Sequence, residues 1–261
     1  MKSQICDLLK IEFPLVAFSH CRDVVAAVSK AGGMGVLGAV GLTPEKLEIE
    51  LNWIDEHVDG KPYGVDVLVP NSYVGKGENL TTDDLRAMIP QEHRDFRSDI
   101  LEQYDLQASD LRSSENSKEL ESNSNGVLGA GLDGAKEVLE VAFAHPISLV
   151  ANALGVPPKW MLEMGKEHNV PVAALVGAKQ HAVKQAEAGV DIIVVSGTEG
   201  GGHCGSVSTM VLVPEVRRAL KDYGDVPILA AGGICTGEQM AGVMAMGADG
   251  VWCASVFLPT T

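Results

Sequence analysis

The 261-residue sequence lacks the features of a membrane, secreted or nucleic-acid-binding protein. No apolar run reaches the roughly 20 residues that a membrane-spanning helix needs, and the first residues, MKSQICDLLKIEF, contain no apolar core of signal-peptide length. Lys and Arg number 20 against 35 Asp and Glu, a formal net charge of −15, so the chain offers little of the basic surface that nucleic acids and anionic membranes require. We therefore expect a cytoplasmic protein that acts on a small molecule.

Cysteine is scarce and irregularly spaced. The five cysteines are Cys6, Cys21, Cys204, Cys235 and Cys253. They form no C-x-x-C pair and their number is odd, which indicates neither a disulfide framework nor a zinc ribbon. This usage fits a reducing compartment, and we expect no metal site.

The remaining composition favours one globular domain over residues 1–261. The hydrophobic fraction of 46% can form a substantial core, and the length suits an α/β barrel, although two small domains are an alternative. Short apolar runs alternate with amphipathic stretches, as parallel strands alternate with covering helices. The expected strands are residues 13–18, 34–40, 63–69, 147–154, 170–176, 191–195, 227–231 and 250–257. Eight such strands favour a closed (β/α)8 TIM barrel over an open doubly wound sheet.

Helix boundary signals agree with this alternation. Thr43 precedes Pro44 and can cap a helix that begins at that proline. Thr236 and Gln239 have the spacing of a capping box. Gly189 and Gly247 are placed where helices should end.

One acidic segment, residues 71–126, interrupts the rhythm. Its second half, residues 107–125, has too few large apolar side chains to form a core. We expect an excursion after the third strand that is helical near residues 85–104 and otherwise partly disordered. We interpret it as a solvated loop, with a lid as the alternative.

The most informative motif is VVSGTEGGGHCG, residues 194–205. Glycine lets backbone approach a flat or phosphorylated ligand, and histidine titrates near neutral pH. The loop follows the sixth strand, so in a barrel it lies on the C-terminal face, where active sites form. We expect a cofactor beside His203; the alternative is that these glycines only make a turn capped by that histidine.

Small residues also end the last two strands, AAGGI at 230–234 and GVWCAS at 250–255. They leave backbone N–H groups free to face an anion, and the loops after strands seven and eight are the usual phosphate site of a barrel. The sequence therefore predicts a phosphorylated cofactor there.

Several motifs together resemble those of the nitronate monooxygenase family, formerly called 2-nitropropane dioxygenases. They are AGGMGVLGA (31–39), PYGVDVLVP (62–70), GVDIIVVSGTEGGGHCG (189–205), ILAAGGI (228–234) and GADGVWCAS (247–255). The likeness covers nearly the whole chain and is closest to actinobacterial-style members with the same charged insertion. Relatives continue past the eighth strand through a closing helix and a further segment, so we expect this chain to be a shortened or truncated member.

The resemblance implies a barrel that binds FMN noncovalently and uses His203 as its active-site histidine. The implied cofactor-binding residues are Ala17, Phe18 and Ser19 at the flavin ring, Asp66 near its polar edge, Ser196, Gly201 and Gly202 in the glycine-rich loop, and Gly232, Gly233, Ala254 and Ser255 at the phosphate. The implied reaction is oxidation of alkyl nitronates, and of nitroalkanes as further substrates, by molecular oxygen to a carbonyl compound and nitrite.

Two alternatives follow from the same motifs. A flavin-dependent enoyl-thioester reductase resembles this family in its barrel and Gly-Gly-His loop, but it needs a nicotinamide cofactor and a basic surface for an acyl carrier, which the charge of −15 disfavours. A non-catalytic barrel, either flavin-binding or vestigial and without cofactor, is the second alternative.

The other histidines have plainer interpretations. We expect His145 and His168 to be structural or surface groups, because no charge partner lies near them in the sequence. His20 follows the first strand and so belongs to the proposed catalytic face.

Overall fold

Eight parallel strands close into a barrel in the order of the sequence. The computed structural model describes residues 3–69, 84, 87–106, 131–202 and 204–258. The strands are β1 Leu15–Ser19, β2 Met34–Gly38, β3 Tyr63–Val67, β4 Leu149–Asn152, β5 Val172–Val176, β6 Ile192–Ser196, β7 Ile228–Ala231 and β8 Gly250–Cys253. Closure comes from pairing of β1 with β8, in which Val16 lies opposite Trp252. The predicted (β/α)8 barrel is confirmed.

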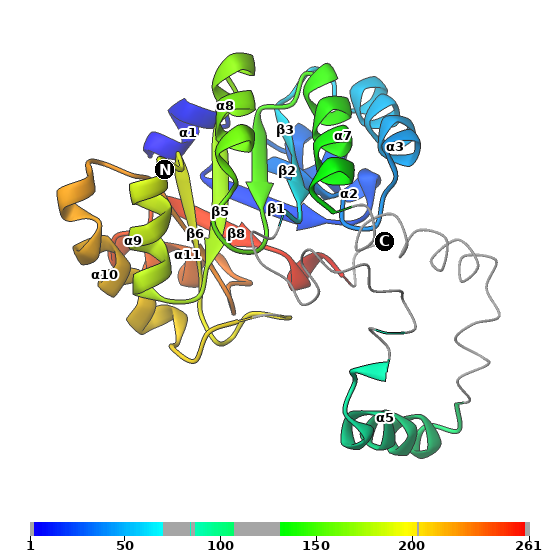
Figure 1. Cartoon of the computed structure of the whole chain (residues 1–261). Helices are drawn as coiled ribbons and strands as arrows, with labels where there is room; N and C mark the ends of the chain where they lie inside the picture. The colour runs from blue at the N-terminus through cyan, green and yellow to red at the C-terminus, as the bar shows by residue number, and fades with distance from the viewer. Residues whose placement is uncertain (1–2, 70–83, 85–86, 107–130, 203, 259–261) are drawn as a thin grey trace.

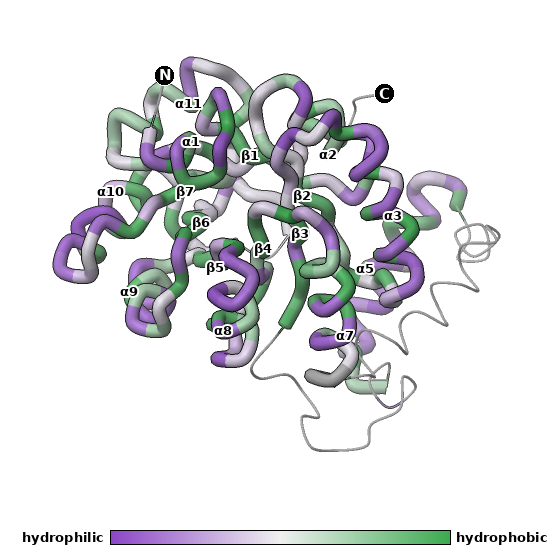
Figure 2. Tube along the Cα trace, turned by 90° about the horizontal axis from the view of Figure 1, so that it is seen from above, coloured by the Kyte–Doolittle hydropathy of each residue, from purple (hydrophilic) through white to green (hydrophobic). Residues whose placement is uncertain are grey.

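The described helices surround the strands, except α5, which lies apart from the barrel (Figure 1). They are α1 Gln4–Leu9, α2 Arg22–Lys30, α3 Pro44–His57, α5 Gln91–Gln103, α7 Gly131–Ala144, α8 Lys159–His168, α9 Lys179–Ala188, α10 Thr209–Ala219 and α11 Gly237–Ala245, with short 3-10 helices η1 Lys221–Tyr223 and η2 Ser255–Phe257. Viewed from above, the strands occupy the middle of the molecule and hydrophilic residues concentrate on the helices (Figure 2). Among the described residues no helix is long and apolar enough to cross a bilayer.

The core consists of an inner and an outer layer because side chains alternate along each strand. Val16, Val36 and Val194 belong to the cluster that fills the barrel. Val65 and Val195 belong to clusters that pack against the surrounding helices. Each strand is therefore buried on both faces, which explains why the sequence shows continuous apolar runs.

The predicted helix caps are present. The Thr43 hydroxyl accepts a hydrogen bond from the Lys46 backbone N–H at 3.4 Å. Thr236 and Gln239 form the reciprocal capping box at the start of α11. Gly189 ends α9 with a φ of 84°, a left-handed conformation that glycine adopts without strain.

An unpredicted helix, α1, closes the N-terminal end of the barrel. Its side chains Ile5, Cys6 and Leu9 are buried and join the cluster inside the barrel. The Ser3 hydroxyl donates to the backbone carbonyl of Asp249, and the Gln4 side-chain amide donates to the Asp249 carboxylate at 3.0 Å. Tertiary contacts hold this six-residue helix, since so short a helix is marginal by itself.

Most predicted strand boundaries differ from the structure by one or two residues, and two elements differ by more. The strand expected at 250–257 ends at Cys253, because Ala254 leaves the extended region with a ψ of −70° and η2 follows. The helix expected near 85–104 is α5, Gln91–Gln103, which has no buried residue. The segment 107–125, for which partial disorder was predicted, lies outside the described residues, and the single-domain organisation stays a prediction.

Candidate active site at the mouth of the barrel

The glycine-rich loop after β6 packs as closely as glycine permits. A Cβ atom on Gly197 would lie 2.1 Å from the backbone nitrogen of Thr209, and one on Gly200 would lie 2.9 Å from the Ser196 hydroxyl. The same Cβ on Gly200 would lie 3.8 Å from the Cα of Gly232, at the end of β7. The backbone of these glycines therefore lies close to Thr209, Ser196 and Gly232, which places the beginning of the loop beside the seventh strand.

The end of β7 presents two consecutive glycines in left-handed conformations. Gly232 has a φ of 94° and Gly233 a φ of 71°. A Cβ on Gly233 would lie 3.0 Å from the Cβ of Glu199. Most side chains are strained at such φ values, so the backbone conformation here depends on glycine.

Glu199 and Thr209 connect these two loops, and neither was predicted from the sequence. A carboxylate oxygen of Glu199 accepts from the Thr209 backbone N–H at 2.9 Å and from its hydroxyl at 3.0 Å. The hydroxyl also lies 3.0 Å from the carbonyl oxygens of Ala231 and Gly232. The bond from the Thr209 backbone N–H lowers the pKa of Glu199, so its negative charge is held at the start of α10. A glutamate in a glycine-rich loop, followed by a Ser-Thr helix start, is the sequence signal for this pair.

The end of β8 meets the same loop. A Cβ on Gly201 would lie 3.3 Å from the Ser255 hydroxyl, and Ala254 directly precedes Ser255 at the end of the strand. Gly202 has a φ of 78° with open space where a Cβ would be. The structure thus brings together the predicted residues from the ends of β6, β7 and β8.

From the end of β1, the Phe18 side chain points into the barrel. Phe18 packs against the inner cluster, with its ring 6.3 Å from that of Trp252 and stacked on it. Ala17 and Ser19 alternate with Phe18 and so direct their side chains to the other face of the strand. The Ser19 hydroxyl accepts from the Cys21 backbone N–H at 3.0 Å. Of the three residues that were expected to line a ligand, Phe18 can therefore do so with its side chain. Ala17 and Ser19 can do so only with their backbone.

His20 also lies at this end of β1. Its Nδ1 atom lies 3.1 Å from the carbonyl oxygen of Gly38, and its ring meets Phe18 edge-on with centroids 5.1 Å apart. A Cβ on Gly38 would lie 2.7 Å from the imidazole. His20 therefore supports the wall of the mouth through contacts with its own protein.

Asp66 is the charged residue placed deepest at the mouth. It lies on β3 between Val65 and Val67, whose side chains face the helices, so its own side chain faces the barrel. Asp66 is 3% exposed, and its Oδ1 atom has no hydrogen-bond partner among the described residues. Burial raises the pKa of this carboxyl well above its usual range. A buried carboxyl without a partner is unfavourable, which points to a ligand that supplies one.

His203 lies outside the described residues, while its neighbours Gly202 and Cys204 are described and exposed. The Cys204 thiol donates to the carbonyl of Thr198 across the loop at 3.6 Å. Ser196 and Cys204 also border a cleft of about 890 Å³ that extends from the mouth toward α9. No group of three metal-ligating side chains occurs in the described part of the chain.

Comparison with known proteins identifies related sequences along the whole chain. A family model described as nitronate monooxygenase matches residues 2–261. A protein of Mycobacterium tuberculosis, named as a candidate monooxygenase, is 51% identical over 261 residues, covering 100% of this chain and 67% of the relative.

Solved structures share the fold. A nitroalkane oxidase from Streptomyces ansochromogenes superposes with a TM-score of 0.72 at 24% identity, over 98% of this chain and 68% of that one. A mutant of FabK from Thermotoga maritima superposes with a TM-score of 0.69 at 24% identity, over 99% and 66%. The chain thus spans about two thirds of the length of the proteins that it matches.

Proposed function

The chain belongs to the nitronate monooxygenase family, a family of flavin-dependent oxidoreductases, and we propose that it binds FMN noncovalently and oxidises alkyl nitronates with molecular oxygen to a carbonyl compound and nitrite. One observation carries the proposal. The glycine-bearing ends of β6 and β7 converge with the end of β8 at the barrel mouth, which the buried Asp66 carboxyl faces, its Oδ1 atom without a partner among the described residues.

The ends of β7 and β8 fit the phosphate of FMN. Gly232 and Gly233 have no side chains to cover their backbone N–H groups, and Ser255 adds a hydroxyl beside Gly201. Backbone N–H groups at such loops bind phosphate well. Glu199 keeps its negative charge near this site, but its hydrogen bonds to Thr209 hold the carboxylate at the start of α10, where the helix dipole partly offsets that charge.

Asp66 fits the polar edge of a flavin ring. Burial raises the pKa of Asp66 and so favours its protonated form, in which one oxygen can donate a hydrogen bond and the other can accept one. A flavin ring edge carries both donors and acceptors. The stacked pair Phe18 and Trp252 supplies an aromatic floor on the same side of the barrel.

The remaining task of the protein is to position the substrate. Bound FMN would supply the redox chemistry, an electron path from the nitronate, which is already a carbanion equivalent, to oxygen. His203 would hold the nitro oxygens as a hydrogen-bond donor. For a neutral nitroalkane the same imidazole would remove the α-proton, a step that typically contributes ~10²–10⁴-fold to the rate.

The visible spectrum of the purified protein tests the cofactor. We expect a yellow protein that releases FMN on denaturation, identified by its mass, and that consumes oxygen and forms nitrite with ethylnitronate. A colourless protein that FMN cannot reconstitute would favour the non-catalytic barrel.

Anaerobic stopped-flow kinetics separate the proposal from the enoyl-thioester reductase alternative. We expect ethylnitronate to bleach the flavin within the turnover time and NADH or NADPH to leave it oxidised. Fast reduction by a pyridine nucleotide, with no response to nitronate, would support the reductase instead.

A further inference from the structure

The cleft beside the proposed catalytic loop is larger than a short alkyl nitronate requires. It crosses the C-terminal ends of β4, β5 and β6 and encloses about 890 Å³, within the range that proteins use for drug-sized ligands. Its inner end reaches Ser196 and Cys204, and its outer end is bordered by α9. A ligand that reacts at the inner end could therefore extend outward over β5.

The walls of the cleft are apolar and partly fixed in place. They include Leu154, Val156, Leu175, Val176 and Val207. The turn after β4 is held by Asn152, whose side-chain amide donates to the carbonyls of Leu154 at 3.1 Å and Gly155 at 3.2 Å. The side-chain oxygen of Asn152 in turn accepts from the Val69 backbone N–H at 2.9 Å. This side of the cleft is thus largely preformed, and its surface suits a hydrocarbon chain.

A buried hydrogen-bond acceptor lies next to this apolar surface. Gln185 of α9 lines the cleft and is only 2% exposed. Its Nε2 atom donates to the carbonyl of Gly155 at 3.0 Å, while its Oε1 atom has no partner among the described residues. Leaving a buried acceptor unpaired costs about 1–3 kcal/mol. The group that would complement it is a donor, such as a hydroxyl or an amide N–H.

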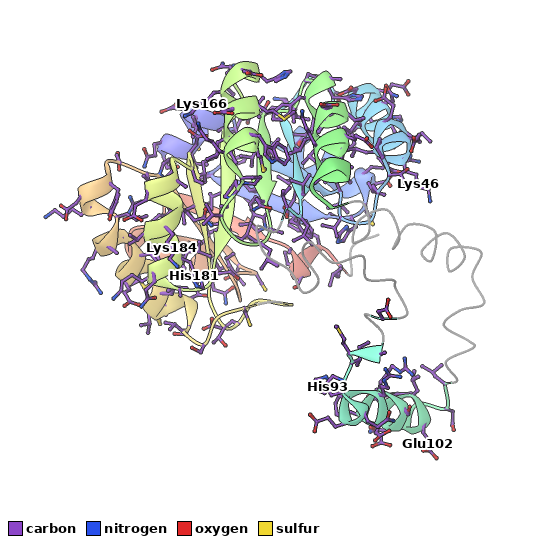
Figure 3. All side chains as sticks on the ribbon, in the orientation of Figure 1. Lys46, His93, Glu102, Lys166, His181 and Lys184 are labelled. Atoms are coloured by element: carbon purple, nitrogen blue, oxygen red, sulfur yellow. The ribbon has the colours of Figure 1, made fainter. Side chains whose placement is uncertain are left out.

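The outer end of the cleft favours an anion. His181 and Lys184 lie one turn apart on α9, border the cleft and are exposed (Figure 3). Neither forms an ion pair with any residue that the structure describes. Helix α9 itself begins after Ala178 with no side-chain cap and no acidic residue in its first turn. Its N-terminal N–H groups and dipole therefore add to the positive charge of Lys184, and the His181 imidazole offers a ring N–H for a hydrogen bond.

We infer that the cleft binds the tail of an extended substrate, in which a hydrocarbon chain carries a hydroxyl or amide N–H that hydrogen-bonds to Gln185 and ends in an anionic group at His181 and Lys184. The inference rests on the proposed function, because the reacting end is taken to lie at Ser196 and Cys204. The anionic end meets a local positive region on a protein whose net charge is −15.

Kinetics with matched nitronates test the anionic end. The nitronates of 8-nitrooctanoate and 1-nitrooctane have the same chain length and differ in the terminal carboxylate. We expect kcat/KM for the carboxylate to be about tenfold higher, mainly through KM, and Lys184→Glu to abolish this ratio. Lys166→Glu is the control: Lys166 is on α8 at the other end of the barrel (Figure 3) and should keep the ratio. A ratio near one in the parent protein, or an unchanged ratio in Lys184→Glu, would overturn the inference.

Calorimetry with unreactive probes tests Gln185 independently of turnover. The probes are octanoate and its 4-, 5- and 6-hydroxy derivatives. We expect at least one hydroxy acid to bind about tenfold more tightly than octanoate, and Gln185→Met to remove that difference. Lys184→Glu should weaken all four, and because Lys184 is exposed this variant keeps the test available if Gln185→Met does not fold.

The two proposals fail in different ways. Probe binding that depends on Gln185 and Lys184, without oxidation of any nitronate, would support the tail site and reject the proposed function. Oxidation of nitronates, with equal binding of all probes in the parent protein and the variants, would support the proposed function and reject the tail site.

Discussion

At the scale of single residues, the proposed site combines groups with different tasks. Gly232 and Gly233 supply backbone conformation, Asp66 supplies a buried carboxyl, and His203 would act on the substrate. Glu199 and Thr209 contact none of the reacting atoms in this proposal, but they hold the loops after β6 and β7 together. A substitution at each kind of residue should therefore change a different measurement.

Replacement of Gly233 by valine should release the flavin. The new side chain would meet Glu199 at about 3.0 Å and would be strained at a φ of 71°, so the loop could no longer approach a phosphate. We expect at least tenfold weaker FMN binding, measured by fluorescence of the released flavin. Gly60→Val is the matched control, because Gly60 has a φ of 67° and open space around it. Equal flavin retention in both variants would place the phosphate elsewhere.

His203→Asn should fold and keep its flavin. If imidazole is the base for neutral nitroalkanes, the variant should lose ~10²–10⁴-fold on nitroethane while retaining most of its activity on ethylnitronate, which needs no proton removal. Oxygen uptake with both substrates measures this split. Equal losses on both would show that His203 binds the nitro group, and no loss would remove it from the mechanism.

At the scale of elements, a partly buried histidine just after α7 joins that helix to α3 and β3. His145 Nδ1 lies 2.6 Å from Asp55 and its Nε2 lies 3.2 Å from Glu48, both on α3. Tyr63 of β3 donates to the other oxygen of Asp55 at 2.6 Å. Burial by itself would lower the pKa of His145, but the hydrogen bonds and charges of the two carboxylates outweigh it and raise that pKa. These contacts agree with the expected structural role, and the charge partners of His145 lie 90 and 97 positions away in the sequence, where spacing could not indicate them.

This cluster makes stability depend on pH. Because the folded pKa of His145 is raised above the ordinary value of about 6.5, its contribution is fully present below that pH and decreases as pH rises through the folded pKa. His145→Gln should therefore lower the free energy of unfolding by ~1–2 kcal/mol at pH 5.5 and by less at pH 8.5, measured by urea denaturation. His93→Gln, on the exposed helix α5, should show no such difference. Equal effects of His145→Gln at both pH values would contradict the assignment.

Local signals were sufficient for the elements, but not for the contacts between them. The strands were predictable because each is a continuous apolar run. Helices α3 and α11 were predictable because the two residues that form each cap lie three positions apart in the sequence. Helix α1 was missed because it depends on contacts with Asp249. The partners of His145 and the burial of Gln185 were missed for the same reason, because both depend on residues far away in the sequence.

At the scale of the whole molecule, the two ends of the barrel have different roles. The C-terminal end carries the cleft, the glycine-rich loops and Asp66. The N-terminal end is held by Arg217, which pairs with Asp249 and donates to the Gly247 carbonyl at 2.7 Å. Such a division lets loops at one end vary while the other end maintains the fold.

The acidic segment, residues 71–126, should be dispensable for the barrel. It lies outside the repeating units, and its second half lacks large apolar side chains. Limited proteolysis should cut first within residues 107–125, as identified by mass spectrometry, and the nicked protein should keep its thermal unfolding transition. First cleavage within residues 200–205 would contradict this prediction.

The contact of α1 with Asp249 also constrains the order of folding. Ser3 and Gln4 bind a residue that follows them by 246 and 245 positions, so α1 cannot obtain its partner until synthesis has passed Asp249. Until then Ile5 and Leu9 have no closed barrel to cover them, and exposed apolar side chains promote aggregation of incomplete chains. Closing so long a loop also slows folding, because its entropy is lost before the contact forms. Helix α1 is thus synthesised well before the contacts that hold it in place can form.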